Sequence, residues 1–564
     1  MFNITKKEIY FVIAVSFALF LITLIPIVYF YAKTPQGSSY LFIKPIISFD
    51  YAVYYSNINQ IIDGKYLLKD LFSGENQNLG TLNIFWLGVG LFAKIFKLAP
   101  PLAFQIARLF CTFFGLFCTY LFISYLVSDK KTRAYILLFA SFASGMDLVI
   151  ILLQALKTIE VTNVIIGFSP EANIFTLSSF SPHFIFSYGL LILCFLFFLI
   201  AIEKNNLKFS LLSGICAFIL SQFHPFHIFT ILFVPFVFLL IKTFQNELPR
   251  NKLMGYPKAR IHSKLWGINP LVPLSGIKKI NWNYAKHYFL LFFFCLPFFI
   301  YHYYLTQVDL FSSLKAMQNI NLTPKFYYLF ATYGLFIILS FLQALKFIKQ
   351  KEFFDKYLFL TVWIVCSIFL VYAPFIFQRR LLEGLNFPLF FLSGLYLINW
   401  IKSFDFEKLS LNNSLNFLFL NFIIVIFIVN NVIFLLIDLR KFDLFYIKNS
   451  DKDAIEFLKQ KSSDNNIILA SHNNSGNIVL LSALTVFSGH PIETLNPNYK
   501  NILVENFYKY NDNDSKNIQF LKENNISYVF YSDAEKKLGS FNPDEKDYLT
   551  KVFEENGTKV YLIK

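Results

Sequence analysis

Apolar residues dominate the chain from Tyr10 to Leu436, and only short polar segments interrupt them. A helix that crosses a membrane needs about 20 mostly apolar residues, and runs of roughly this length recur throughout this region. The pattern predicts a multi-pass α-helical membrane protein with about 11 transmembrane helices. The predicted spans are residues 9–31, 102–127, 134–152, 182–202, 208–222, 226–243, 285–304, 326–346, 357–376, 383–400 and 414–437.

A further apolar stretch, 82–98, is interpreted as a helix that does not span. It is short, contains Lys94 and Lys97, and ends at two prolines. If it does not span, the lysine-rich loops all lie on one side, which the positive-inside rule assigns to the cytoplasm. We therefore predict a protein of the cell (cytoplasmic or inner) membrane, with a cytoplasmic N-terminus and an extracytoplasmic C-terminal domain.

The composition changes sharply after residue 437, where Asn, Asp, Glu and Lys become frequent and no run is long enough to span. Apolar runs such as "NIILAS" and "ISYVFYS" alternate with helix-like segments such as "DAIEFLKQK". This alternation predicts a soluble α/β domain with a partly parallel sheet. The predicted domains are a membrane domain, 1–437, with amphipathic helices in its outer loop 32–101, and an extracytoplasmic α/β domain, 438–564.

Composition agrees with this division. The chain is 56% hydrophobic and only 15% charged, whereas a soluble domain has about 25% charged residues. The net charge of +15 is concentrated in short loops between apolar runs, so it indicates topology and not nucleic-acid binding. All six cysteines lie in apolar runs, so no disulfide framework is expected.

The segment "FDYAVYYSNINQIIDGKYLLKD" follows the first span. Its tyrosines and isoleucines recur at helical spacing and predict an amphipathic helix over 50–63, lying in the outer membrane interface with its tyrosines at headgroup depth. Asp50 lies at the start of this helix. It acts as an N-cap, as a general base at the membrane surface, or as both. Asp63 and Asp70 are expected to be solvated loop residues.

Three arginines lie at or near the predicted outer face. Arg108 is about two turns into its span, where it either snorkels to the interface or binds phosphate inside the bundle. Arg379 and Arg380 occupy a very short outer turn, "FQRRLLEG". They suit phosphate oxygens, and the alternatives are lipid headgroups or pairing with Glu383.

Other polar residues are predicted on the same outer face. Glu171 and His183 flank a loop between spans, and His224 and His227 lie in the next outer hairpin, "QFHPFHIF". This clustering makes them candidate site residues, with the histidines binding substrate. Two carboxylates with three histidines could ligate a divalent metal, but no HxxxH or HExxH spacing supports a metal, and we expect no cofactor.

The arrangement resembles the GT-C superfamily. These integral-membrane glycosyltransferases use polyprenyl-phosphate-linked sugars. The resemblance rests on the outer acid after the first span, the non-spanning apolar helix, the segment "FQIARL" and the basic outer turn. The tail resembles a soluble domain of some bacterial members through "ILASHNNSGNIVLLSALTVFSGHPIET" and "LKENNISYVFYSDAEKKLG".

The resemblance implies roles for the candidate residues. Asp50 matches the catalytic base, and Glu171 loosely matches a second acid. Many members have two adjacent acids at the first position, whereas here Asp50 is followed by Tyr51. The arginines match positions that hold lipid phosphate. The implied activity is inverting sugar transfer from a polyprenyl-phosphate carrier to a glycan, lipid or protein acceptor on the extracytoplasmic face. The protein would also contact membrane lipid.

Two other functions remain as alternatives. A transporter or lipid flippase would place polar groups near the bilayer midplane, often on broken helices in paired halves. A glycan polymerase or ligase would use polyprenyl diphosphate and a large outer loop late in the chain. In the tail, His490 and Glu493 of "GHPIET" either line an acceptor cleft or are ordinary strand-end residues.

Overall fold

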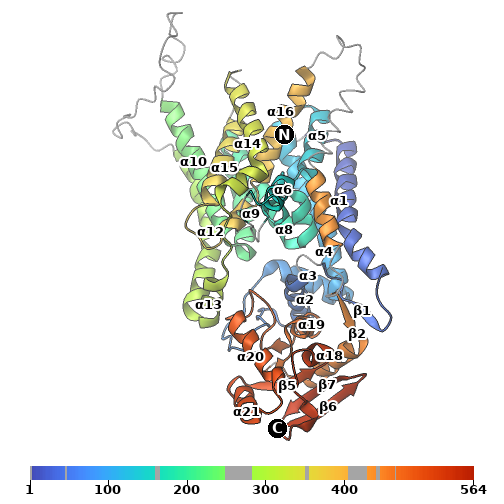
Figure 1. Ribbon diagram of the computed structural model, residues 1–564. Helices are drawn as coiled ribbons and strands as arrows, with labels where there is room; N and C mark the ends of the chain where they lie inside the picture. Colours follow the sequence, from blue (N-terminus) through green and yellow to red (C-terminus); the bar gives the residue numbers. More distant parts are fainter. Residues whose placement is uncertain are drawn as a thin grey trace, which may run out of the picture.

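The computed structural model describes residues 3–44, 48–158, 160, 165–247, 282–349, 355–403, 428–439, 445–463 and 465–564. Long helices form a bundle, the C-terminal residues form a sheet with helices, and α2 and α3 lie between the two parts (Figure 1). The basic loop 244–284 and the first part of the predicted span 414–437 lie largely outside the described residues.

Within the described part of the chain, seven helical segments are long and apolar enough to cross a membrane. The protein is therefore a multi-pass membrane protein, and the count of about eleven spans stays a prediction. The seven are α1 (Lys6–Ala32), α4 (Pro100–Leu126), Lys130–Ala155, α8 (Pro182–Lys204), α12 (Trp282–Val308), α14 (Phe326–Lys349) and Gln378–Lys402. Shorter neighbours are α9 (Leu207–Phe223), α10 (His227–Glu247), α13 (Leu310–Gln318) and α15 (Asp355–Leu370).

The predicted span 134–152 is two helices, α5 (Lys130–Phe142) and α6 (Asp147–Ala155). The break is stabilised by Asp147, which is fully buried. Its carboxylate accepts hydrogen bonds from Thr332 Oγ1 (2.7 Å) and Asn430 Nδ2 (2.6 Å). A similar break precedes α16 (Asn386–Ser403), where the 3₁₀ turn η4 (Gln378–Leu382) forms the predicted basic outer turn.

Helix α3 (Ile84–Phe96) corresponds to the stretch that we predicted not to span. Its 13 residues extend about 20 Å, which is shorter than the roughly 30 Å hydrocarbon core. Asn83 caps its N-terminus by accepting a hydrogen bond from the Trp86 backbone N–H. The helix packs against α2 and α4, so its length agrees with a helix that stays at one face.

Helix α2 (Ser48–Ile62) matches the predicted amphipathic helix, with Asp50 in its first turn. The expected headgroup environment of its tyrosines is wrong for Tyr51 and Tyr55, which are completely buried. Both rings pack on Phe104 of α4, at centroid distances of 5.2 and 5.5 Å. The helix also packs against α19, so protein covers the face that was expected to meet lipid.

The C-terminal residues form a mixed five-stranded sheet of order β4-β3-β5-β7-β6. Strand β3 is parallel to β4 and β5, whereas β7 is antiparallel to β5 and β6. The strands are β3 (Ile467–Leu469), β4 (Thr485–Val486), β5 (Ile526–Tyr531), β6 (Leu549–Glu555) and β7 (Thr558–Ile563), and the larger helices are α18 (Asn449–Lys461), α19 (His472–Ser482), α20 (Pro497–Lys509) and α21 (Asp514–Glu523). Four strands lie at the predicted apolar runs, and β6 and α20 are additional.

The loop after α1 is bound to the C-terminal part of the chain. Strand β1 (Ser38–Tyr40) pairs antiparallel with β2 (Tyr446–Lys448). Further along this loop, the Val486 backbone N–H donates to the Leu71 carbonyl (2.9 Å), and Thr494 Oγ1 donates to the Phe72 carbonyl (2.9 Å). These contacts hold the segment after β4 against Leu71 and Phe72, and the same segment reaches the start of α2, where the rings of His490 and Phe49 are 6.0 Å apart.

Candidate functional site

A cavity of about 600 Å³ lies between α2, the α9–α10 hairpin, α12, η4 and the segment after β4. Four of the eight predicted site residues line it, namely Asp50, His183, His224 and Arg380. Glu493 adds a second carboxylate. Much of the remaining wall is aromatic and includes Tyr54, Phe184, Phe223, Phe226, Phe229, Phe299, Tyr303 and Phe377.

Asp50 is accessible from this cavity, since its side chain is 44% exposed. Its Oδ1 lies 3.5 Å from Nε2 of His490, in the segment after β4. Tyr54, one turn further along α2, lines the same cavity. Burial, and then the charge of Asp50, raise the pKa of the Tyr54 phenol well above its ordinary value, so this phenol remains a neutral hydrogen-bond donor.

Arg380 is held by Glu171, which is fully buried. Arg380 Nη1 lies 2.7 Å from Glu171 Oε1, and Arg379 Nε lies 3.8 Å from Glu171 Oε2. The alternative pairing of these arginines with Glu383 is therefore wrong. A guanidinium has five N–H donors, so Arg380 can bind Glu171 and still present donors to the cavity.

Arg108 lies in a different place. It is completely buried among the helices and does not line the cavity. Its Nη1 donates to the carbonyls of Ser179 (3.2 Å) and Thr23 (3.4 Å). Its guanidinium lies over the Phe20 ring, 5.0 Å from the centroid. The structure thus separates Arg108 from the other predicted phosphate ligands, and it does not snorkel to an exposed position.

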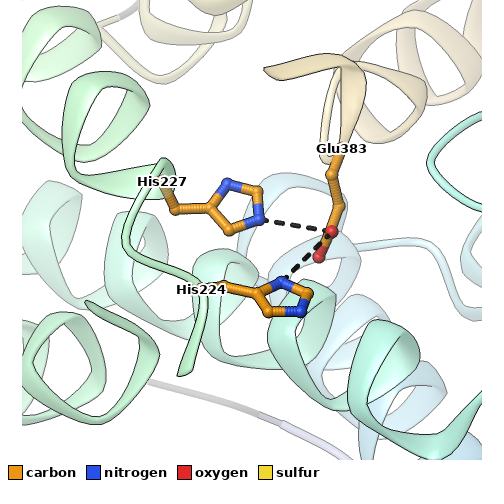
Figure 2. A group of neighbouring side chains, drawn as sticks. All are labelled: His224, His227 and Glu383. Carbon is orange, nitrogen blue, oxygen red and sulfur yellow. Dashed lines mark ion pairs between the residues drawn. The ribbon is translucent and has the colours of Figure 1, made fainter. Parts of the chain in front are cut away.

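His224 and His227 both face one carboxylate, that of Glu383 (Figure 2). Nε2 of His227 lies 3.2 Å and Nδ1 of His224 3.7 Å from Glu383 Oε2. Ser187 Oγ donates a hydrogen bond to Glu383 Oε1. His183 lies beside His224, with ring centroids 5.2 Å apart, and its Nδ1 contacts Ser181 Oγ. Glu383 was not predicted as a site residue, because it lies 156 positions after His227 in the sequence.

Three charged residues connect the cavity to the C-terminal part. Lys315 of α13 pairs with Asp70 (2.6 Å) and also with Glu493. The expectation that Asp70 is solvated is wrong, since its side chain is only 4% exposed; Asp63 is exposed, as expected. Burial, and then the charge of Glu493, raise the pKa of Asp70 to about 6 although Lys315 opposes the shift.

An apolar groove adjoins the cavity. It has a volume of about 330 Å³ and lies between α10 and α12. Phe229 and Phe299 line both spaces. The other lining residues of the groove are Ile228, Leu232, Phe233, Phe236, Tyr288, Phe292, Cys295 and Leu296. An amphiphilic molecule could therefore place its polar end beside Asp50 and Arg380 and its apolar part between the two helices.

His302, which was not predicted as a site residue, also lines the cavity. Its Nε2 contacts the Gln222 carbonyl at 2.9 Å. It is one histidine near the end of a long apolar run, and no spacing distinguishes it. For His490 and Glu493 the sequence allowed either an acceptor cleft or ordinary strand ends. The structure places Glu493 in the cavity wall and His490 beside Asp50.

Neither a protein-family model nor a curated protein sequence matches the chain. Solved structures do. The oligosaccharyltransferase AglB from Archaeoglobus fulgidus, in complex with an inhibitory peptide and a dolichol-phosphate, matches with a TM-score of 0.50 and 10% identity, over 99% of this chain and 75% of that one. Its apo form matches with a TM-score of 0.50 and 11% identity, over 97% and 74%.

ArnT from Cupriavidus metallidurans, in the apo state, matches with a TM-score of 0.47 and 10% identity, over 99% of this chain and 98% of that one. AglB and ArnT are GT-C glycosyltransferases. The match to AglB covers nearly the whole chain, so the fold of this protein resembles that of the GT-C superfamily, as the sequence motifs indicated.

Proposed function

We propose that this chain is a membrane glycosyltransferase that moves a sugar from a polyprenyl-phosphate carrier to an acceptor on the extracytoplasmic face. The observation that carries the proposal is one cavity lined by Asp50 and Arg380 that adjoins an apolar groove through Phe229 and Phe299. A lipid with an anionic head needs this combination, because its chain requires apolar surroundings and its phosphate requires a cation.

The fold supports the same class of reaction. The AglB structure that matches this chain was obtained with a dolichol-phosphate, which is a polyprenyl-type lipid phosphate. A carrier of this kind reaches the protein from the bilayer. The groove between α10 and α12 is lined almost entirely by apolar side chains and suits the first isoprene units of such a chain.

The proposed reaction is a single inverting displacement. The acceptor hydroxyl loses its proton to Asp50 while its oxygen attacks the anomeric carbon of the sugar. The bond between this carbon and the phosphate oxygen breaks, and the electron pair leaves with the polyprenyl phosphate. Arg380 stabilises the charge on the departing phosphate, and a preorganised donor of this kind contributes most in a site that excludes water. Glu171 positions Arg380.

The proposal is tested by replacing Asp50 with asparagine, which keeps the shape but removes the base. Purified wild-type and D50N proteins in liposomes would be given radiolabelled polyprenyl-phosphate sugars and an acceptor mixture, and the labelled product would be measured. We expect a loss of about 10²- to 10⁴-fold in rate for D50N, the usual contribution of general-base catalysis. Asp63, exposed at the other end of α2, supplies the matched control D63N, which should retain the wild-type rate.

The same assay separates the alternatives. A flippase would move labelled lipid across the liposome membrane without forming a product. A polymerase or ligase would prefer a polyprenyl-diphosphate donor over the monophosphate. Full activity of D50N would remove Asp50 as the base and overturn the proposed mechanism.

A further inference from the structure

We propose that His224, His227 and Glu383 form a binding site for one divalent transition-metal ion of the zinc type. The three side chains come from two parts of the chain, the α9–α10 hairpin and the turn before α16, and converge on one point (Figure 2). All three are buried, and one possible ligand atom from each lies within 4.8 Å of the other two. The inference does not depend on the proposed transferase reaction.

The distances fit a metal centre. Zinc binds imidazole nitrogen and carboxylate oxygen at about 2.0–2.2 Å in a tetrahedral arrangement, which separates neighbouring ligand atoms by about 3.4 Å. The distances from Glu383 Oε2 to His227 Nε2 and His224 Nδ1 are 3.2 and 3.7 Å. They lie on either side of this value, and a nitrogen of each histidine lies within 4.8 Å of one from the other, so a small movement of the side chains would bring the three atoms to this spacing.

The hydrogen-bonding state of these atoms also indicates a missing ligand. Among the described residues, Glu383 Oε2, His224 Nδ1 and His227 Nε2 have no hydrogen-bond partner. A buried polar group without a partner costs about 1–3 kcal/mol, and a buried carboxylate costs more. Arg380, three residues before Glu383 in the chain, is bound to Glu171. A metal ion would satisfy all three atoms and neutralise the carboxylate at once.

The local sequence explains why the two imidazoles converge. The His227 backbone N–H donates to the His224 carbonyl (3.2 Å), so "HPFH" forms a four-residue turn with proline at its second position, which its fixed φ favours. The two histidines are the ends of this turn, and their side chains leave the same side. Gly384 has a φ of +91°, which glycine adopts without strain, and it turns the chain into α16 after Glu383.

The environment of Glu383 resembles that of a metal ligand in a second respect. Ligating carboxylates are usually held by an outer hydrogen bond, and Ser187 Oγ donates to Glu383 Oε1 while leaving Oε2 for the ion. Two imidazoles and one carboxylate are the protein ligands of several zinc sites that keep an open fourth position. His224 lines the cavity, so this position would admit water or an anionic oxygen.

The test measures metal binding directly. Untagged, full-length protein in detergent would be stripped with a chelator, dialysed, and titrated with Zn²⁺ and Co²⁺, and the bound metal would be counted by mass spectrometry. We expect binding of about one ion per chain, visible Co²⁺ absorption of a tetrahedral site, and a Zn²⁺-dependent rise in the unfolding midpoint.

Variants then assign the site. Loss of a residue that only hydrogen-bonds a metal ligand weakens metal binding by roughly 10- to 100-fold, and S187A should fall within this range. H227A and E383Q each remove a ligand and should weaken binding by more than this. The matched control is H287A. His287 is also buried and contacts Ser210 and Asn205, at the opposite end of α9, and H287A should bind metal like the wild type.

Two outcomes would overturn the proposal. In the first, metal-stripped wild-type protein shows neither a Co²⁺ spectrum nor a shift of the unfolding midpoint. The cluster would then be an ion pair between Glu383 and a protonated histidine. The other is equal binding by wild type, H227A and E383Q. If both variants fail to fold, the wild-type spectrum and midpoint decide the question alone.

Discussion

His490 directs Nε2 of its ring toward Asp50 Oδ1, 3.5 Å away, and thereby joins the C-terminal part of the chain to the candidate base. Its other nitrogen, Nδ1, accepts the backbone N–H groups of Ile492 (3.0 Å) and Glu493 (2.9 Å). These two donors fix the tautomer that carries its proton on Nε2. The ring is only 1% exposed, so it presents a fixed donor to a carboxylate that the cavity leaves accessible.

We therefore predict that His490 is a positioning residue for Asp50. Replacing it with alanine should lower kcat about tenfold, which is about 1.4 kcal/mol of activation free energy, and leave KM for the donor nearly unchanged, because Asp50 loses the imidazole N–H that lies 3.5 Å away and restricts its orientation. H490Q, whose amide N–H can donate from a similar position, should recover part of the loss. Initial rates of sugar transfer measure both effects.

The control for His490 is His472. Its ring also packs on Phe49, at a centroid distance of 4.7 Å, but among the described residues it makes no contact with Asp50. H472A should therefore keep the wild-type kcat. If H490A and H472A lose equal activity, or if H490Q recovers nothing, the contribution of His490 is packing alone.

A second prediction concerns Glu171 and Arg380. If Glu171 acts by holding Arg380, then E171Q and R380Q should each lower kcat/KM by about a hundredfold, the typical cost of removing a donor to a developing charge. The double variant should be little worse than either single one, because the two residues act as a unit. R379Q should lose much less, since Arg379 Nε is 3.8 Å from Glu171.

Additive losses would contradict this coupling. A loss for E171Q far greater than that for R380Q would instead make Glu171 an acid that acts on substrate, as the family resemblance implied. The complete burial of Glu171 behind the two arginines favours the coupled outcome.

Local patterns predicted most of the helices and strands, because apolar length and periodicity reflect burial directly. The 13-residue helix α3 was distinguished from a span by its charges and prolines. The break between α5 and α6 was not predicted, because Asp147 is satisfied by Thr332 and Asn430, which lie far away in the sequence. A buried carboxylate of this kind has no local signal.

The candidate site was predicted in part for the same reason. Asp50 and Arg380 stood out as charges beside apolar runs, and both line the cavity. The partners of the site residues depend on the tertiary fold: Glu383 meets the histidine turn, and His490 meets Asp50, from remote segments. The buried state of Tyr51 also depended on the tertiary fold, because its ring packs on Phe104 of α4.

A third prediction follows from Asp70, whose pKa is raised to about 6 from an ordinary value of 3.8, first by burial. An acid that binds its proton more tightly when folded contributes stability below about pH 4, and this contribution is lost as the pH rises to about 6. Folded Glu493 stays ionised in this window, since Lys315 outweighs burial and lowers its pKa to about 2. The free energy of unfolding should fall by roughly 1 kcal/mol between pH 4.5 and 6.

Thermal unfolding in detergent at a series of pH values measures this slope. D70N, which cannot ionise, should have a nearly flat profile over the same range, and D63N should keep the wild-type slope because Asp63 is exposed. The charged neighbours Lys315, Glu493 and Lys500 do not reverse their ionisation in this window. A wild-type midpoint that rises from pH 4.5 to 6 would contradict the assignment.

The last prediction separates the two possible roles of Arg108. The family resemblance implies a ligand for lipid phosphate, but the side chain is fully buried and binds the carbonyls of Thr23 and Ser179. Methionine has a similar length and no charge. R108M should therefore lower the unfolding midpoint, because two buried carbonyls lose their donor and an unsatisfied buried acceptor costs about 1–3 kcal/mol, and should leave KM for the donor unchanged.

The opposite pattern, a raised donor KM with an unchanged midpoint, would make Arg108 a phosphate ligand after all. It would also require the donor to reach a position that α1 and α4 enclose, since Phe20 and Thr23 of α1 cover the guanidinium. R380Q is the matched comparison, because Arg380 lines the cavity and its loss should raise KM or lower kcat. The two variants together decide which guanidinium meets the lipid phosphate.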